Sequence, residues 1–172
     1  MSESEWWGRI LSTMKVLIPI LMGLLVMGCG EKKHKPLTKE ESARHAKVIE
    51  AAIHEAAGKP TGELTKADLE KVTKLYLHIN KLTDVKGLEK LTKLTTLYLS
   101  YNKLTEVPKG LEKLTQLKEL WLVSNQLTDV KGLEKLTQLE VLFLGDNPAL
   151  TKAQIAELKK ALPKCKITHN AK

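Results

Sequence analysis

An asparagine recurs along this chain at nearly equal intervals, each time inside the same leucine-rich phrase, LxxLxLxxNxL. The phrase is repeated in VTKLYLHINKL from Val72, LTTLYLSYNKL from Leu94, LKELWLVSNQL from Leu117 and LEVLFLGDNPAL from Leu139. Successive asparagines, at positions 80, 102, 125 and 147, are 22, 23 and 22 residues apart. A coil of this length cannot cover its own leucines, so the repeat predicts stacked coils around a continuous apolar column.

Each phrase predicts one short strand followed by a turn. The alternation of leucine with other residues is typical of a half-buried strand, and stacking makes these strands parallel. Where the chain leaves each strand, the asparagine amide can hydrogen-bond the backbone of its own and adjacent coils. We therefore expect the asparagines to be structural.

The repeats resemble the internalin-like, short-period class of bacterial leucine-rich repeat proteins over about residues 64–150. The resemblance implies an α/β fold, a solenoid whose parallel concave sheet has four or more strands. Concave faces in this class commonly bind other proteins, which implies a binding module and no catalytic activity.

A helix is expected at each end of the leucine column. Thr38 to Glu41 has the spacing of a capping box, and the apolar residues that follow recur at helical intervals, namely Val48, Ile49, Ala52, Ile53 and Ala56. A second capping box at Thr151 precedes the apolar face Ile155, Leu158 and Leu162, and Pro163 ends this helix. Residues 165–168 then predict a last edge strand.

The N-terminal part of the chain has a different character. VLIPILMGLLVM, from Val16 to Met27, holds 12 uncharged residues, which suits a signal-peptide core better than a bilayer span. The following Gly28-Cys29 completes a segment that resembles the lipobox of bacterial lipoproteins, which implies cleavage before Cys29 and its acylation. A buried hydrophobic helix and a short membrane anchor are the alternatives, and the start codon is either Met1 or Met14.

This interpretation divides the chain into five parts. They are a lipoprotein-type signal peptide (1–28), a tether (29–37), an N-terminal helical cap (38–62), the leucine-rich repeats (63–150) and a C-terminal cap (151–172). It predicts a protein held in the cell envelope by a lipid, in the outer membrane because glycine follows the cysteine. The alternative is a cytoplasmic scaffold.

Composition and motifs argue against several other functions. The net charge is +8, but lysines alternate with glutamates in phrases such as KGLEKLTKL, which indicates a solvated surface and no nucleic-acid site. The five histidines have no metal-ligand spacing, and no phosphate-binding glycine loop is present, so neither a metal nor a cofactor is expected. Asp84, Glu106 and Asp129 recur once per coil and are expected as turn residues. Cys165 is expected as a small buried side chain in a monomer.

Aromatic residues occupy one position of every strand. Tyr76, Tyr98, Trp121 and Phe143 are predicted to point away from the leucines, on the concave face, although aromatics make up only 4% of the chain. Neighbouring positions, among them Thr96 and Ser100, are expected to point the same way. The predicted ligand-binding residues are Tyr76, His78, Tyr98, Tyr101, Trp121 and Phe143, and the ligand is a protein or a glycan. Alternatively, the rings only stack on one another in a structural envelope protein without a ligand.

Overall fold

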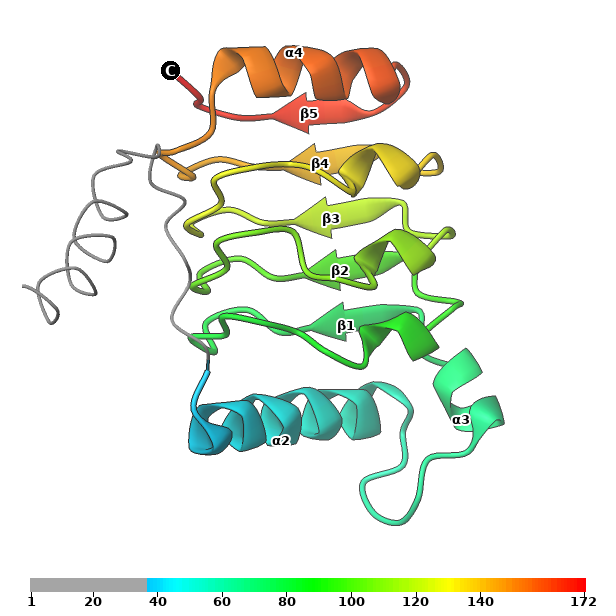
Figure 1. The fold of residues 1–172 in the computed structure, drawn as a ribbon. Coiled ribbons are helices and arrows are strands. Elements are labelled where there is room, and N and C mark those ends of the chain that lie inside the picture. The colour runs from blue at the N-terminus through cyan, green and yellow to red at the C-terminus, as the bar shows by residue number, and fades with distance from the viewer. Residues whose placement is uncertain (1–36) are drawn as a thin grey trace, which may run out of the picture. The chain divides into compact units, whose positions relative to one another are not determined.

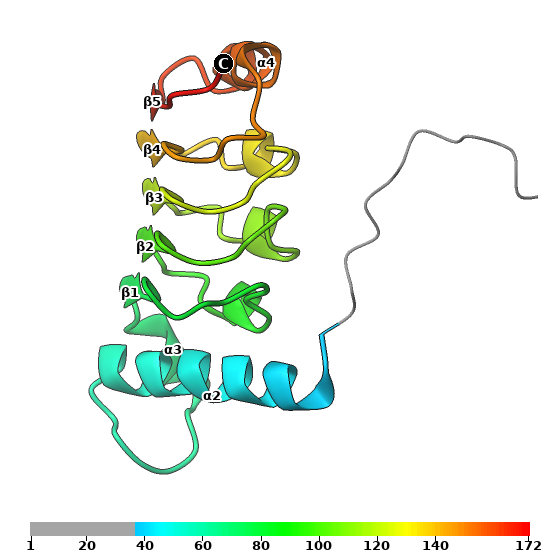
Figure 2. The same cartoon turned by 90° about the vertical axis from the view of Figure 1, so that its left-hand side faces the viewer.

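The computed structural model describes residues 37–172, which form a stack of coils with one strand each (Figure 1). Five parallel strands make one sheet in chain order: β1 (Lys74–Tyr76), β2 (Thr96–Tyr98), β3 (Glu119–Trp121), β4 (Val141–Phe143) and β5 (Lys166–Thr168). Figure 2 shows the strands along one side of the stack and short 3-10 helices along the other. The predicted fold class, a leucine-rich repeat solenoid with a parallel sheet, is confirmed.

The leucines of the repeat fill the space between these two sides. Nearly all of them are fully buried, for example Leu97, Leu99 and Leu120 at 0% exposure. Each coil returns through a 3-10 helix: η1 (Leu88–Lys90), η2 (Leu111–Lys113) or η3 (Leu133–Lys135). The residue before each 3-10 helix is a glycine with φ between 91° and 95°, a conformation that L side chains rarely adopt. The KGLEKL phrase therefore directs the chain back toward the next strand.

The asparagines form a hydrogen-bonded ladder through the stack. Asn102 accepts hydrogen bonds at Oδ1 from the amides of Leu82 (2.9 Å) and Asn80 (3.2 Å), and its Nδ2 donates to the carbonyls of Leu77 (2.8 Å) and Leu99 (2.9 Å). Asn125 and Asn147 repeat this bridging between their own coil and the preceding one. The predicted role of the asparagines is confirmed for these three. The side chain of Asn80, in the first coil, donates to the local carbonyl of His78 and makes no bond to another coil within residues 37–172.

Helix α2 (Lys39–Ala56) covers the first coil, with the predicted capping box between Thr38 and Glu41. Its buried face consists of His45, Ile49 and Ile53. Ala56 was expected on this face but is exposed at the last position of the helix, whereas His45, which was not predicted there, is buried. Arg44 ties the helix to the solenoid by donating to the carbonyl of Asn80 over 3.1 Å.

A short helix, α3 (Lys66–Glu70), lies between α2 and β1 and was not predicted. It begins with a third capping box, in which Thr65 and Asp68 bond reciprocally. Lys59 and Lys71 pair with Asp68 at 3.0 and 3.1 Å. Hydrogen bonds from the Thr65 hydroxyl, Lys59 and Lys71 hold the pKa of Asp68 well below its usual range.

Helix α4 (Lys152–Ala161) covers the last coil, as predicted. The Thr151 capping box is present, Ile155, Leu158 and Leu162 are buried, and β5 forms the expected edge strand. Within residues 37–172, no helix is both long and apolar enough to span a membrane. The predicted signal peptide and Cys29 lie outside the described residues.

Replacing Asn102 tests the ladder. Asn102→Leu removes the partners of two amides and two carbonyls in a buried site, and each unpaired buried group costs about 1–3 kcal/mol. We expect the free energy of unfolding, measured in urea, to fall by about 3 kcal/mol or more. The matched change Asn80→Leu removes one local hydrogen bond and should cost about 1 kcal/mol or less. Equal losses from the two changes would contradict the ladder's role.

His45 is expected to make the N-terminal cap less stable in acid. The Arg44 guanidinium donates to His45 Nε2 over 2.8 Å, which requires a neutral imidazole, and His45 is 4% exposed. Burial, and next the Arg44 cation, lower the pKa of His45, while Asp84 and Glu41 act in the opposite direction. Because the folded-state pKa lies below the unfolded value, this contribution to stability is fully present above about pH 7 and is lost as pH falls toward the folded pKa.

We therefore expect the free energy of unfolding to decrease between pH 7.5 and pH 5.5, in a window above the titration of the carboxylates. The measurement is urea unfolding at both pH values for the native chain and His45→Gln, which should lose most of the decrease. His78→Gln removes an exposed imidazole and serves as the control. A pH dependence that survives His45→Gln unchanged would show that another group causes it.

Candidate functional site

The four aromatic side chains predicted from the repeat lie side by side on the open face of the sheet. Tyr76 pairs in register with Tyr98, Tyr98 with Trp121, and Trp121 with Phe143. Their ring centroids are 4.7, 5.5 and 3.9 Å apart, and the interplanar angles are 10°, 27° and 26°. These four residues are called the aromatic column below. The next strand places Thr168 opposite Phe143, which ends the column.

The stacking determines which part of each ring faces solvent. Tyr98 and Trp121 each have a neighbouring ring on both faces, so mainly their edges remain available. Both are half-buried, as is Phe143, whereas Tyr76 at the end of the column is 55% exposed. Burial, and next the neighbouring Tyr76 and Glu119, raise the pKa of Tyr98, so its phenol is neutral at physiological pH. The two central rings of the column therefore present mainly their edges to solvent.

The remaining predicted site residues flank the N-terminal end of the column. His78 is exposed and lies edge-on to Tyr76, at 6.3 Å and 84°. Tyr101 is 59% exposed and has no ring contact among the described residues. The structure thus brings five of the six predicted residues into ring contact and leaves Tyr101 beside them.

Two small polar residues beside Tyr98 are buried, although their positions in the repeat lie on the outside face of the sheet. Thr96 and Ser100 were expected to point away from the leucines, and the structure buries them to 6% and 8% exposure. Ser100 Oγ and Trp121 Nε1 are both buried without a hydrogen-bond partner among residues 37–172, and such atoms are uncommon in native structures. Sequence alternation could not reveal this, because it predicts the direction of a side chain but not what covers it.

Two aspartates of the repeat, Asp84 and Asp129, have structural roles. Asp84 and Asp129 accept from the amides of the residues that follow them and pair with Lys86 (3.3 Å) and Lys131 (3.2 Å). These two residues lie in the loops that follow the strands, but they are half-buried rather than exposed as expected. Cys165 is half-buried, and burial raises the pKa of its thiol, which makes it a poor nucleophile. No cluster of three or more potential metal ligands occurs in residues 37–172.

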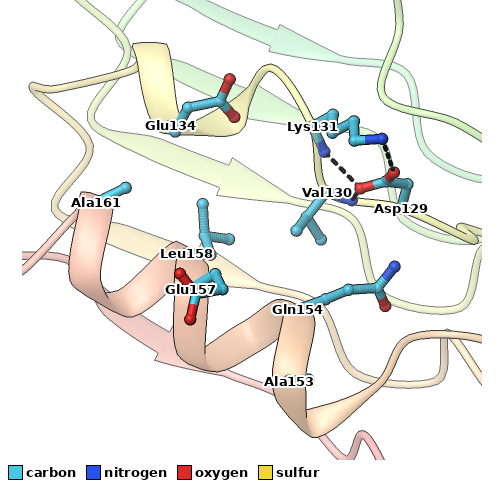
Figure 3. A pocket seen from close by; sticks show the side chains of 9 residues that line it. All are labelled: Asp129, Val130, Lys131, Glu134, Ala153, Gln154, Glu157, Leu158 and Ala161. Atoms are coloured by element: carbon cyan, nitrogen blue, oxygen red, sulfur yellow. Dashed lines mark hydrogen bonds and ion pairs between the residues drawn. The ribbon is translucent and has the colours of Figure 1, made fainter.

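A groove of about 550 Å³ lies on the other side of the solenoid, between η3 and α4 (Figure 3). Apolar side chains of Val130, Ala153, Leu158 and Ala161 line it together with polar and charged ones. Its carboxylates are already engaged: Asp129 pairs with Lys131, Glu157 with Lys160, and Glu134 accepts from the Gly132 amide. The groove therefore does not coincide with the aromatic column, and its three carboxylates are held in ion pairs or a backbone hydrogen bond.

Comparison with known protein families agrees with the coil architecture. Residues 70–127 match a family described as leucine rich repeat, and residues 115–160 match one described as leucine rich repeats (2 copies). No curated protein matches the chain.

Several solved structures are similar. An internalin C2 of Listeria monocytogenes is 26% identical with a TM-score of 0.60, and the match covers 70% of this chain and 52% of that one. A leucine-rich repeat protein of Leptospira interrogans is 35% identical, with a TM-score of 0.54 and coverage of 62% and 28%. An internalin (inlF) of Listeria monocytogenes is 25% identical, with a TM-score of 0.58 and coverage of 76% and 44%. The chain thus spans about half or less of each of these proteins.

Proposed function

The chain is a leucine-rich repeat protein, and from this premise we propose that it binds a protein partner on the aromatic column, without catalysis. Leucine-rich repeat proteins generally act as binding scaffolds for other proteins. The observation that carries the proposal is a run of four rings, in register, on the open side of a sheet. Aromatic side chains supply much of the energy at protein interfaces, because they bury a large area with few rotatable bonds.

The geometry of the rings favours a protein over a glycan. Sugars stack on the flat face of an aromatic ring, but the column uses the faces of Tyr98 and Trp121 for its own stacking. A peptide or a folded protein can instead pack against ring edges and hydrogen-bond the neutral Tyr98 hydroxyl. Parallel strands are about 4.8 Å apart, so the column is roughly 15 Å long, enough for a short peptide segment.

The location proposed for this activity is the bacterial envelope. The segment ahead of Cys29 has the length of a signal-peptide core and ends in a sequence that resembles a lipobox. Acylation of Cys29 would hold residues 37–172 at a membrane surface, where partners are membrane-bound or envelope proteins. A bilayer anchor of this kind does not require a spanning helix.

Lipid attachment is tested by expression in bacteria with labelled palmitate. The native chain should incorporate the label and partition with membranes, and Cys29→Ala should do neither, because the acylated sulfur is missing. Cys165→Ala, which alters only the second cysteine, is the matched control and should label like the native chain. Equal labelling of the native chain and Cys29→Ala would rule out lipidation at this residue.

Ligand binding is tested by Trp121→Ala, which removes a central ring of the column. Pull-downs from envelope extract, with a glycan array in parallel, should capture a protein with the native chain. Its affinity for the variant should be weaker by about 2 kcal/mol, or roughly 30-fold. Lys90→Ala, on η1 at the other side of the coil, should bind like the native chain.

Circular dichroism of each variant must first confirm the fold. If the native chain captures nothing above background, or if Trp121→Ala captures the same protein equally well, the rings serve only to pack on one another. The protein would then be a structural component of the envelope without a specific ligand. If the native chain binds only on the glycan array, the partner is a sugar and the proposal of a protein partner is wrong.

A further inference from the structure

The backbone is left-handed at one equivalent residue in each of the first four coils, the residue before the repeated asparagine. Ile79, Tyr101, Ser124 and Asp146 have φ of 61°, 58°, 53° and 54°. At three of these positions, the amide donates to a carbonyl of the next coil: Ile79 to Ser100, Tyr101 to Val123, and Ser124 to Gly145. The stacking of the coils therefore requires the left-handed turn, whatever side chain occupies it.

The side chain at this left-handed position differs between the first two coils and the fourth. Asparagine, aspartate and glycine tolerate left-handed backbone best, and the fourth coil has such a residue, Asp146. The first two coils instead have isoleucine and tyrosine, and a β-branched residue with positive φ is a genuine outlier. Ile79 and Tyr101 are thus unfavourable choices for the fold itself.

Packing does not compensate for this strain. Ile79 is 69% exposed and Tyr101 is 59% exposed. Together with Tyr76 they are the exposed large hydrophobic residues of the described part of the chain, and all three belong to the first two coils. Strained, exposed apolar residues gain nothing in the free protein, whereas a partner that covers them would recover the free energy of burial. Ile79 and Tyr101 are called the strand-end pair below.

Cations flank the strand-end pair. Lys81 and Lys103 follow the asparagines of the same two coils and are exposed, and neither makes an ion pair within residues 37–172. Arg44 reaches the same turn by donating to the carbonyl of Asn80. The third and fourth coils have Gln126 and Pro148 at the lysine positions. The strand-end pair and these lysines without ion pairs therefore lie in the same two coils, the first and the second.

We infer that the strand-end pair is a docking site for a protein segment with apolar side chains flanked by acidic ones. This inference rests on the proposed function and specifies the chemistry of the partner. The apolar side chains cover Ile79 and Tyr101, and the carboxylates lie against Lys81 and Lys103. The aromatic column, which begins at Tyr76 in the same coil as Ile79, continues the contact along the sheet.

The probes are short synthetic peptides with a leucine-phenylalanine centre. One set has aspartate and glutamate flanks, a second has lysine flanks, and a third has acidic flanks around a serine centre. Binding to residues 29–172 is measured by fluorescence anisotropy at low salt, where electrostatic contributions are largest. The native chain should bind the acidic, apolar set at least tenfold more tightly than either control set.

The decisive variant is Ile79→Asn/Tyr101→Asn, because it should improve the fold while removing the site. Asparagine suits the left-handed backbone, so we expect Tm to rise by about 2–4 °C while peptide affinity falls at least tenfold. Ser124→Asn changes the same backbone position in the third coil and should leave peptide binding unchanged. Lys81→Glu/Lys103→Glu should reverse the preference toward the lysine-flanked peptides.

Each contrary result has a distinct meaning. Undiminished binding by Ile79→Asn/Tyr101→Asn, a lower Tm for it, or no preference of the native chain for the acidic, apolar peptides would overturn the inference. The inference would also be overturned if the native chain dimerises with concentration in sedimentation and this variant does not. The strand-end pair would then bind a second copy of the chain. If Trp121→Ala loses binding while Ile79→Asn/Tyr101→Asn binds fully, the proposed function stands. Only the docking role of the strand-end pair is then rejected.

Discussion

The fold depends on one constraint: backbone groups in a stack of coils are buried, and they need partners where the strands end. Strands of only three residues satisfy few of these groups. A side-chain amide supplies both donors and an acceptor, so one buried asparagine joins the turn of its own coil to that of the coil before it. Leucine packing then follows, because the ladder fixes the distance and the register between coils.

The register set by the ladder also creates the surface of the sheet. Once every coil is in register, each position of the repeat becomes a straight row of side chains, one per strand. A row inside the stack is leucine, and a row outside is free to vary. The aromatic column and the strand-end pair occupy two such outside rows, three positions apart in the repeat. The side chains of the outside rows can therefore differ between coils while the leucine core stays the same.

The sequence was sufficient for the solenoid, the strands and both terminal helices, because their signals are local and repeated. Thr38 and Thr151 begin helices through a spacing of three residues, which can be read without any tertiary information. Helix α3 has the same signal at Thr65 but is only five residues long, so no apolar period accompanies it.

Other features depend on what lies across space. His45 is buried because α2 turns that face to the first coil, and Ser100 is buried although its position in the repeat is an outside one. The left-handed backbone at Ile79 follows from hydrogen bonds between coils, and isoleucine gives no local indication of it. The aromatic column was predictable as a row, but its mutual stacking, which determines that edges face outward, was not.

The direct pairing of each strand with the next one along the chain has a consequence for how such a protein changes over generations. Each coil contacts mainly its two neighbours, so duplication of one repeat in the gene inserts a coil without disturbing distant ones. Every such event would add one ring to the column and lengthen the surface by a fixed increment. The reach of the binding face can thus vary by copy number, while the end caps remain the same.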